Sequence, residues 1–177
     1  YTAPCQDGCP IHQEIPTYVA LAGEGKYEEA LKVILNRNAL PFMTGTICSH
    51  PCQGYCTRNF YEKSVQIRNT KLECAEQAMD AIIDCVSVTG DYSGSVAVVG
   101  GGPAGMAAAR LGAKVTIYEK RERLGGVVSA IIPNFRIDDS VIAKDAALLE
   151  KLGVKVLYNT EAPAVDVLKK EYDSVIL

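Results

Sequence analysis

The stretch Val96-Ala97-Val98-Val99-Gly100-Gly101-Gly102-Pro103-Ala104-Gly105 decides the fold of the second half of the chain. Its apolar residues predict a buried strand, and a G-x-G-x-x-G pattern follows directly and opens a helix. Gly100 permits a tight turn, Gly102 lets the backbone approach a diphosphate, and Gly105 lets helix and strand pack closely. The helix begins at Pro103 and Ala104, and the free N–H groups of its first turn, which proline itself lacks, favour an anion. The stretch therefore predicts a dinucleotide site.

An acidic residue strengthens this prediction. Glu119 ends the next predicted strand, Lys114 to Tyr118, and is placed to accept hydrogen bonds from a ribose hydroxyl, with Lys120 directly after it. A glycine triplet alone could equally be a flexible turn, and Glu119 alone a solvated acid. Strand, turn, helix and acid together favour the dinucleotide interpretation.

Strands and helices alternate around this site. Strands are predicted at 96–99, 114–118, 154–157 and 174–177, and helices from about Pro103 and over 141–152. This alternation predicts a parallel sheet covered by helices. A linker from Thr89 to Ser95 precedes it, so we expect two domains, residues 1–90 and residues 91–177, the second incomplete. Since the chain starts at Tyr1 and stops within a predicted strand, we expect it to be a fragment.

The N-terminal half is predicted to be helical. Helices are expected over Pro16 to Gly23, Lys26 to Arg37 and Val65 to Val88, with a loop from Phe42 to Asn59. The long helix has apolar residues every three or four positions, which predicts an amphipathic helix: Leu72, Ala75, Met79, Ile82 and Val86.

Five of the seven cysteines lie in two tight groups. Cys5 and Cys9 form C-x3-C, and Cys48, Cys52 and Cys56 form C-x3-C-x3-C. Thiolates grouped beside proline and glycine suit an iron–sulfur cubane, whereas zinc usually shows C-x2-C, although C-x3-C does not exclude it.

The other candidate metal ligands receive weaker interpretations. Cys74 and Cys85, on the long predicted helix, are interpreted as packed thiols. His50 is expected to make hydrogen bonds or to meet solvent, and His12 has no assigned role.

Composition excludes several partners. A net charge of −3 and the absence of a polybasic run argue against nucleic acid and anionic lipid. No apolar stretch approaches the roughly 20 residues of a spanning helix, so we expect no membrane association. Grouped cysteines favour metal ligation in a reducing compartment, and we expect a cytoplasmic protein.

The motifs G-G-G-P-A-G, E-K and L-G-G resemble those of flavin-dependent pyridine-nucleotide oxidoreductases. This resemblance implies that Leu124-Gly125-Gly126-Val127 lies against FAD, and that Ile132-Pro133-Asn134-Phe135-Arg136 continues the cofactor wall. Arg136 is then an FAD contact, the alternative being an exposed salt-bridge arginine. Between Gly105 and Lys114 the chain is about one helical turn shorter than that group, through a deletion or a missing segment.

Over its whole length the chain resembles the N-terminal module of glutamate synthase small subunits and dihydropyrimidine dehydrogenase, and most closely the family labelled selenate reductase subunits. The resemblance rests on the order of three motifs before the FAD fingerprint: Cys5-Gln6-Asp7-Gly8-Cys9-Pro10-Ile11, Asn38-Ala39-Leu40-Pro41-Phe42-Met43-Thr44-Gly45 and the cysteine triplet. It implies an α-helical iron–sulfur domain, with two 4Fe–4S clusters, followed by an α/β Rossmann-like FAD domain that exchanges hydride with NADPH.

The resemblance also implies a ligand set. Cys9, Cys48 and Cys52 would serve one cluster, and Cys5 and Cys56 the other. Lys71 stands where relatives offer Gln or Glu as a fourth ligand, so one cluster using four of the five cysteines stays open, with Glu73 as a weak substitute.

The expected function is that of an oxidoreductase component, with no catalytic residue assigned. It would relay electrons between NADPH, FAD and one or two 4Fe–4S clusters, toward another subunit or domain. One alternative is a docking domain stabilised by zinc or an inert cluster. Another is an NAD-only dehydrogenase, which is disfavoured because the sequence shows no catalytic His, Lys or Tyr constellation.

Overall fold

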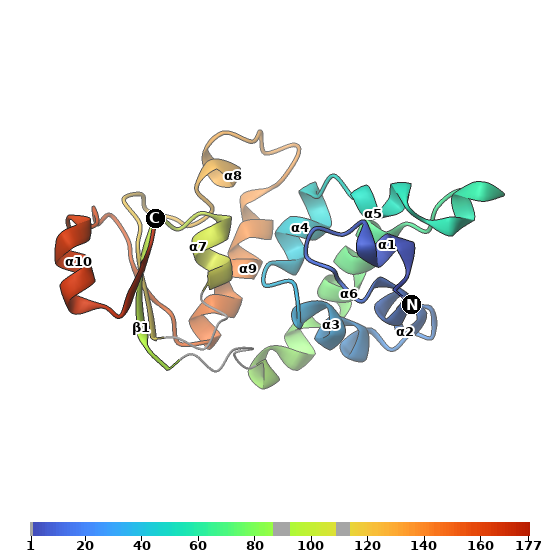
Figure 1. The fold of residues 1–177 in the computed structure, drawn as a ribbon, viewed down its shortest axis with the longest axis horizontal. Helices are drawn as coiled ribbons and strands as arrows, with labels where there is room; N and C mark the ends of the chain where they lie inside the picture. The colour runs from blue at the N-terminus through green and yellow to red at the C-terminus, as the bar shows by residue number, and fades with distance from the viewer. Residues whose placement is uncertain (1, 87–92, 109–113) are drawn as a thin grey trace. The chain divides into compact units, whose positions relative to one another are not determined.

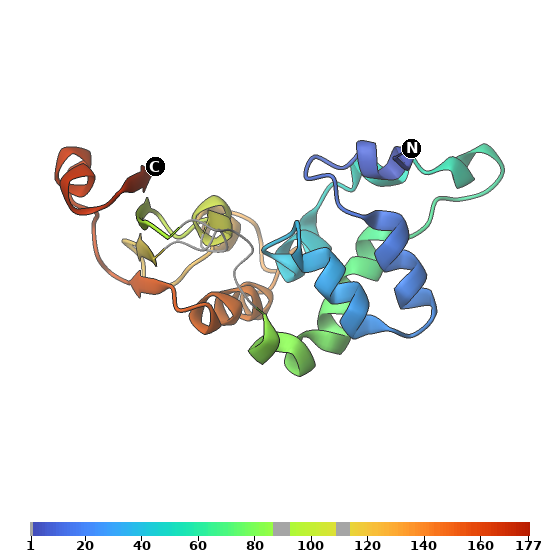
Figure 2. The ribbon, with the colours of Figure 1, turned by 60° about the horizontal axis from the view of Figure 1, so that its bottom comes forward.

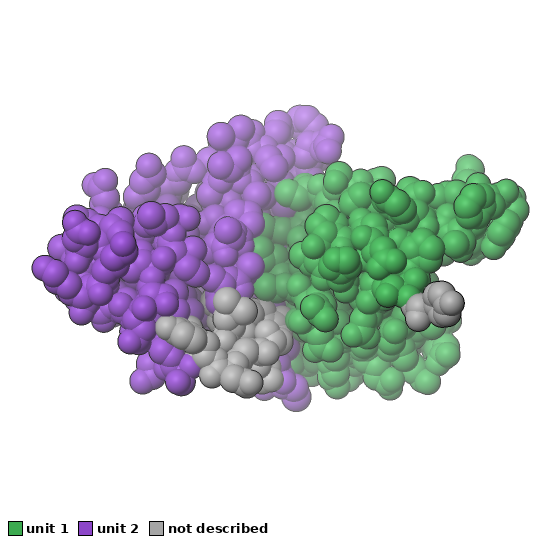
Figure 3. Space-filling view, in the orientation of Figure 1, with its two compact units in different colours: residues 1–83 green, residues 84–177 purple. Residues whose placement is uncertain are grey.

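The computed structural model describes residues 2–86, 93–108 and 114–177. The chain divides into two compact units, residues 1–83 and residues 84–177, shown in two colours in Figure 3. The predicted bounds of 1–90 and 91–177 fall among residues 87–92, outside the described residues, and stay a prediction. None of the helices in the described ranges is long and apolar enough to cross a bilayer.

In the first unit, the described residues form helices joined by turns and loops, with no strand among them (Figures 1 and 2). Helix α6, Ile67–Ile82, packs against the three helices α2, Ile15–Gly23, α3, Tyr27–Leu35, and α4, Pro41–Ile47. Two single-turn helices, α1, Pro4–Asp7, and α5, Pro51–Gly54, pack against each other and carry cysteines. Short 3-10 turns cover Thr57–Phe60 and Ile83–Cys85. The core is formed by buried apolar side chains of these helices, including Ala30, Leu31, Ile34, Ala75, Ala78 and Met79.

Three of the predicted helices of this unit are confirmed, as α2, α3 and α6, with ends shifted by a few residues. The predicted loop from Phe42 to Asn59 is wrong, because it contains α4 and α5. Pro41 occupies the first turn of α4, where its missing N–H is not needed, and Phe42 and Met43 are buried. A Cβ at Gly45 would lie 2.8 Å from the Leu72 Cβ, so α4 reaches α6 at a glycine. Helices this short show little periodicity in sequence.

The second unit contains a four-stranded parallel sheet in the order β3-β2-β1-β4. The strands are β1, Ser95–Val99, β2, Lys114–Tyr118, β3, Lys155–Leu157, and β4, Ser174–Ile176. In register, Val98 of β1 lies beside Ile117 of β2 and Ile176 of β4. Each predicted strand is therefore confirmed, and so is the parallel sheet.

Helices lie on both sides of this sheet (Figure 1). On one face Ala97 and Tyr118 pack against Leu168 of α10, Val165–Glu171. Helices α7, Pro103–Ala108, and α9, Asp139–Lys151, lie on the other face. The sequence did not predict α10 or the single turn α8, Val127–Ala130. The shortened segment between Gly105 and Lys114 falls largely on residues 109–113, outside the described residues.

Candidate cofactor sites

The glycine turn joins β1 to α7 with little space to spare. Gly100 has a φ of +98°, which favours glycine, and its N–H donates to the Tyr118 carbonyl at 2.8 Å. A Cβ at Gly105 would lie 2.4 Å from the Gly100 carbonyl oxygen and 2.7 Å from Val98 Cγ1. The predicted close packing of helix and strand is therefore present at Gly105.

Gly102 is surrounded differently. A Cβ there would meet nothing within 4 Å, so the turn is open on this side. Gly126 approaches it closely, since a Cβ at Gly126 would lie 2.9 Å from Gly102 Cα. The Gly125 N–H also donates to the Gly101 carbonyl at 2.8 Å. The pair Gly101 and Gly102 and the pair Gly125 and Gly126, far apart in sequence, thus lie together. They form one wall of bare backbone, which carries no side chains.

Glu119 ties this wall to the end of β2. Its side chain is buried, one carboxylate oxygen accepts the Gly101 N–H at 2.7 Å, and the other accepts the Arg121 N–H at 2.8 Å. A carboxylate oxygen has more than one acceptor site, so the group can still accept from a ribose hydroxyl. Glu119 therefore holds the turn in addition to the role predicted from sequence.

A cleft of about 530 Å³ lies beside these residues, within the size range of ligand sites. Six of the predicted cofactor residues line it: Gly100, Gly102, Glu119, Lys120, Gly126 and Val127. The other six do not, namely Pro103, Ala104, Gly105, Leu124, Gly125 and Arg136. Thr160 to Val165 form the opposite side and were not predicted, because nothing in that segment resembles a nucleotide motif.

Arg121 is a lining residue that sequence reasoning missed. Its guanidinium donates to the Gly126 carbonyl at 3.3 Å, which places a cation beside the bare backbone. Its position directly after the E-K motif was the available signal. Arg136, in contrast, is exposed and does not line the cleft, and its assignment as an FAD contact stays a prediction.

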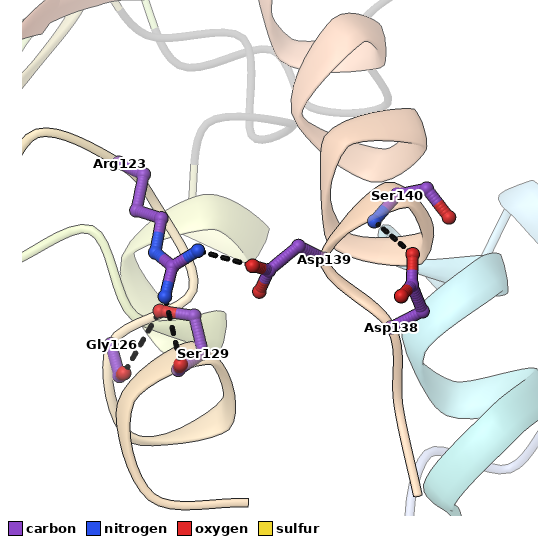
Figure 4. A network of polar contacts seen from close by, with 6 residues as sticks. All are labelled: Arg123, Gly126, Ser129, Asp138, Asp139 and Ser140. Carbon is purple, nitrogen blue, oxygen red and sulfur yellow. Dashed lines mark hydrogen bonds and ion pairs between the residues drawn. The ribbon is translucent and has the colours of Figure 1, made fainter. Parts of the chain in front are cut away.

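A polar network supports the second glycine pair (Figure 4). The Arg123 guanidinium pairs with the Asp139 carboxylate at the start of α9 and donates to the Ser129 carbonyl at 3.4 Å. Asp138 caps α9 by accepting the Ser140 N–H at 2.9 Å, and this bond lowers the pKa of the Asp138 carboxyl. These contacts connect the Leu124-to-Val127 segment to α9.

The two cysteine loops meet in the first unit. α1 packs against α5, and a Cβ at Gly8 would lie 2.4 Å from Cδ2 of the Tyr55 ring. Glycine is therefore needed beside Cys9 to let the ring lie next to Cys56. The loops that are 40 residues apart in sequence are brought together by this contact.

The cysteines of the two loops act on one another electrostatically. Burial, then the thiolates of Cys9 and Cys48, raise the pKa of the Cys52 thiol to about 11. Burial chiefly raises the pKa of Cys5, and Cys56 adds to this shift. Cys52 thus has Cys9 and Cys48 among its neighbours, and Cys5 has Cys56, while the division of the five cysteines between two clusters stays a prediction.

Lys71 faces Cys9, Cys48 and Cys52. Its side chain is 6% exposed, and burial lowers its pKa while Cys48, Cys9 and Cys52 oppose that shift. Glu73 is exposed, and its carboxylate accepts the Tyr27 hydroxyl at 3.0 Å. Glu73 is therefore engaged outside the cysteine group and does not replace the missing fourth ligand.

The remaining candidates are placed as follows. Cys74 is fully buried, as predicted, and burial raises its pKa to about 11. The same prediction is wrong for Cys85, which is exposed because α6 ends at Ile82 and a 3-10 turn follows. The backbone N–H of His50 donates to Cys48 Sγ at 3.3 Å, the predicted role of the His50 side chain stays a prediction, and His12 keeps no assigned role.

No three His, Cys, Asp or Glu side chains in the described ranges converge closely enough to hold a single metal ion. The thiols nearest Cys52 come instead from two loops, since Cys9 and Cys48 are its neighbours. An iron–sulfur cubane takes its ligands on several metal atoms and so holds them farther apart than one ion does. The donor set, thiols with hydrogen-bonded sulfur, fits a cluster.

Fold and sites together define a class of protein: a helical iron–sulfur domain joined to a Rossmann-like nucleotide-binding domain. Residues 1–82 match the family described as dihydropyrimidine dehydrogenase domain II, 4Fe–4S cluster. Residues 98–143 match the NAD(P)-binding Rossmann-like domain family. Both matches confirm the resemblance to the glutamate synthase and dihydropyrimidine dehydrogenase superfamily, and residues 1–82 are similar to its iron–sulfur domain.

Individual relatives agree with this assignment. The chain is 44% identical over 165 residues to the "Putative oxidoreductase YgfK" of Escherichia coli (strain K12), covering 89% of the chain and 16% of the relative. It is 33% identical over 178 residues to the NADPH glutamate synthase small chain of Bacillus subtilis (strain 168), covering 96% and 36%. It is 32% identical over 205 residues to the NADP(+)-dependent formate dehydrogenase subunit beta of Moorella thermoacetica, covering 99% and 29%.

The chain therefore spans between 16% and 36% of the length of these relatives. The closer likeness to selenate reductase subunits stays a prediction.

Proposed function

We propose that this chain is the electron-relay part of an FAD- and iron–sulfur-dependent oxidoreductase that passes electrons between NADPH, FAD and 4Fe–4S clusters. One observation carries the proposal: a group of thiols and a wall of bare glycine backbone occur on the same chain. Flavin, when bound, links two-electron donors such as NADPH to one-electron acceptors. Relatives named for NADPH or NADP(+) chemistry support the choice of nicotinamide.

The second unit would hold the FAD diphosphate. Gly102 leaves room for a phosphate, and α7 begins directly after it at Pro103. Arg121 and Lys120 supply positive charge at the cleft, and Glu119 supplies acceptors for a ribose hydroxyl. The diphosphate and a ribose hydroxyl of a dinucleotide therefore have matching groups in this cleft.

The first unit would hold iron. Cys9, Cys48 and Cys52 would bind one 4Fe–4S cluster, and Cys5 and Cys56 would contribute to a second. The hydrogen bond from the His50 backbone N–H to Cys48 Sγ withdraws negative charge from that sulfur, which stabilises the sulfur as a ligand. The final acceptor would be another subunit or domain, and we expect the protein to act in the cytoplasm.

The test is the iron, sulfide and flavin stoichiometry of the full-length protein, purified or reconstituted without oxygen. We expect iron and sulfide in equal amounts, a flavin absorption band and a paramagnetic signal after reduction. A colourless protein with none of these would refute the proposal. Zinc without sulfide would instead favour a metal-stabilised docking domain, and extracted NAD without flavin would favour a simple dehydrogenase.

A further inference from the structure

The face of α6 that looks toward the Cys48–Cys52 loop carries two cations. Arg68 and Lys71 are three residues apart and so lie on one side of the helix. Arg68 holds the loop at both ends, because its Nη1 donates to the Cys48 carbonyl at 3.3 Å and its backbone N–H donates to the Gln53 side chain at 3.3 Å. Gly45 packs on Leu72, directly beside Lys71. The loop is therefore fixed against this part of α6.

Lys71 is buried without a carboxylate partner among the described residues. A buried ammonium is costly unless an opposite charge compensates it. The anionic groups that act on Lys71 are the thiolates of Cys48, Cys9 and Cys52. The Nε of Arg68 is buried there too and has no hydrogen-bond partner among the described atoms. This side of the thiol group thus carries uncompensated positive charge.

We propose that Lys71 stands at the fourth-ligand position as a cation outside the coordination shell, where it stabilises the reduced form of the cluster held by Cys9, Cys48 and Cys52. The inference rests on the proposed function, since it requires that cluster. One-electron reduction adds a negative charge to the cluster, and a nearby positive charge favours that change. Net charge around a cluster is one of the properties that set its reduction potential.

The proposal distinguishes this chain from an arrangement with a side-chain amide or carboxylate as fourth ligand. Neither of those groups brings positive charge, and a carboxylate brings negative charge. A cluster beside Lys71 is therefore the better electron acceptor of the two arrangements. Arg58, the cation that acts on Cys56, is exposed and paired with Glu62, so we expect the effect of a buried cation to be confined to the first cluster.

The experiment is a dithionite titration of the reconstituted full-length protein, followed by electron paramagnetic resonance at defined potentials. Lys71→Met removes the charge and keeps the apolar length of the side chain. We expect the equilibrium constant for one-electron reduction of the cluster to fall about tenfold, which is about 59 mV for a one-electron couple. Lys71→Arg keeps the charge and should stay within threefold of wild type. Lys32→Met, an exposed lysine on α3, controls for the loss of one charge from the surface.

Two outcomes would overturn the inference while the proposed function stands. The first is an unchanged potential in Lys71→Met with iron and sulfide at wild-type levels. The second is a Lys71→Arg potential as low as that of Lys71→Met, which would mean that the lysine amine binds iron directly. If Lys71→Met fails to hold a cluster, Lys71→Leu carries the same test, because leucine is also neutral and has no atom that could bind iron. Absence of iron and sulfide from the wild-type protein would instead refute the proposed function itself.

Discussion

Substitution by alanine at Gly105 and at Gly102, two glycines of the dinucleotide turn, should affect different properties of the protein, stability in the first case and flavin binding in the second. A methyl group at Gly105 would lie 2.4 Å from the Gly100 carbonyl oxygen, a backbone atom that cannot swing aside. Overpacking of this kind costs about 1–3 kcal/mol, and the better helix propensity of alanine offsets at most about 1 kcal/mol. We expect Gly105→Ala to destabilise the second unit by roughly 2 kcal/mol, or about 8–16 °C in Tm for a domain of this size.

Gly102→Ala is the matched variant. Its methyl group would meet nothing within 4 Å, so we expect a change in unfolding free energy below about 1 kcal/mol. The methyl would, however, stand where the diphosphate approaches the backbone. We expect flavin affinity to fall at least about tenfold, which corresponds to about 1.4 kcal/mol.

Thermal unfolding by circular dichroism and flavin titration by absorbance would measure both effects on each variant. The two variants should separate, one losing stability and the other losing flavin. Unchanged flavin binding in Gly102→Ala would contradict the placement of the diphosphate at this turn. Unchanged stability in Gly105→Ala would contradict the close approach of α7 to β1.

Three further predictions concern other parts of the chain. Gly45→Ala should destabilise the first unit by about 1–3 kcal/mol in chemical denaturation, because its Cβ would lie 2.8 Å from Leu72 Cβ. Gly54→Ala, whose Cβ would meet nothing within 4 Å, should leave the free energy of unfolding nearly unchanged. Equal effects of the two variants would contradict the packing of α4 on α6. Iodoacetamide at pH 8, read by peptide mass spectrometry, should label exposed Cys85 well before Cys74, whose burial raises its pKa to about 11, and faster labelling of Cys74 would refute its burial. The hydrogen bond to Tyr172 and then burial raise the pKa of Tyr118 to about 12. The stability that neutral Tyr118 contributes is therefore present below pH 10 and lost as pH rises through 12. Tyr172→Phe should lower the pKa of Tyr118 in a phenolate absorbance titration, and an unchanged pKa would exclude the hydrogen bond as the cause.

The sheet and its glycine turn could be predicted because each local signal agreed with the next. The apolar run at 96–99, the glycines after it and Glu119 all indicate the same strand–turn–helix unit. α4 could not be predicted in this way. Its stability comes from Phe42 and Met43 packing in the core, and seven residues are too few to display a helical period.

Some features of the candidate sites could likewise be predicted from the sequence, and others are seen only in the fold. The grouping of cysteines by spacing indicated metal, but only the fold shows that Lys71 faces three of them while Glu73 turns to Tyr27. Two positions on one helix, two residues apart, point in different directions. Cys85 was misplaced for a related reason, since the sequence pattern continues past Ile82 while the helix does not.

The carboxylate of Glu119 has a consequence for how cofactor enters. Because the Glu119 carboxylate, at the end of β2, accepts a hydrogen bond from the Gly101 N–H, the glycine turn is already fixed in its conformation before a cofactor binds. A dinucleotide would then bind to a preorganised turn, so the turn would lose little conformational entropy on binding. Capture should be quick and limited by encounter, with no slow rearrangement of the turn in the binding kinetics.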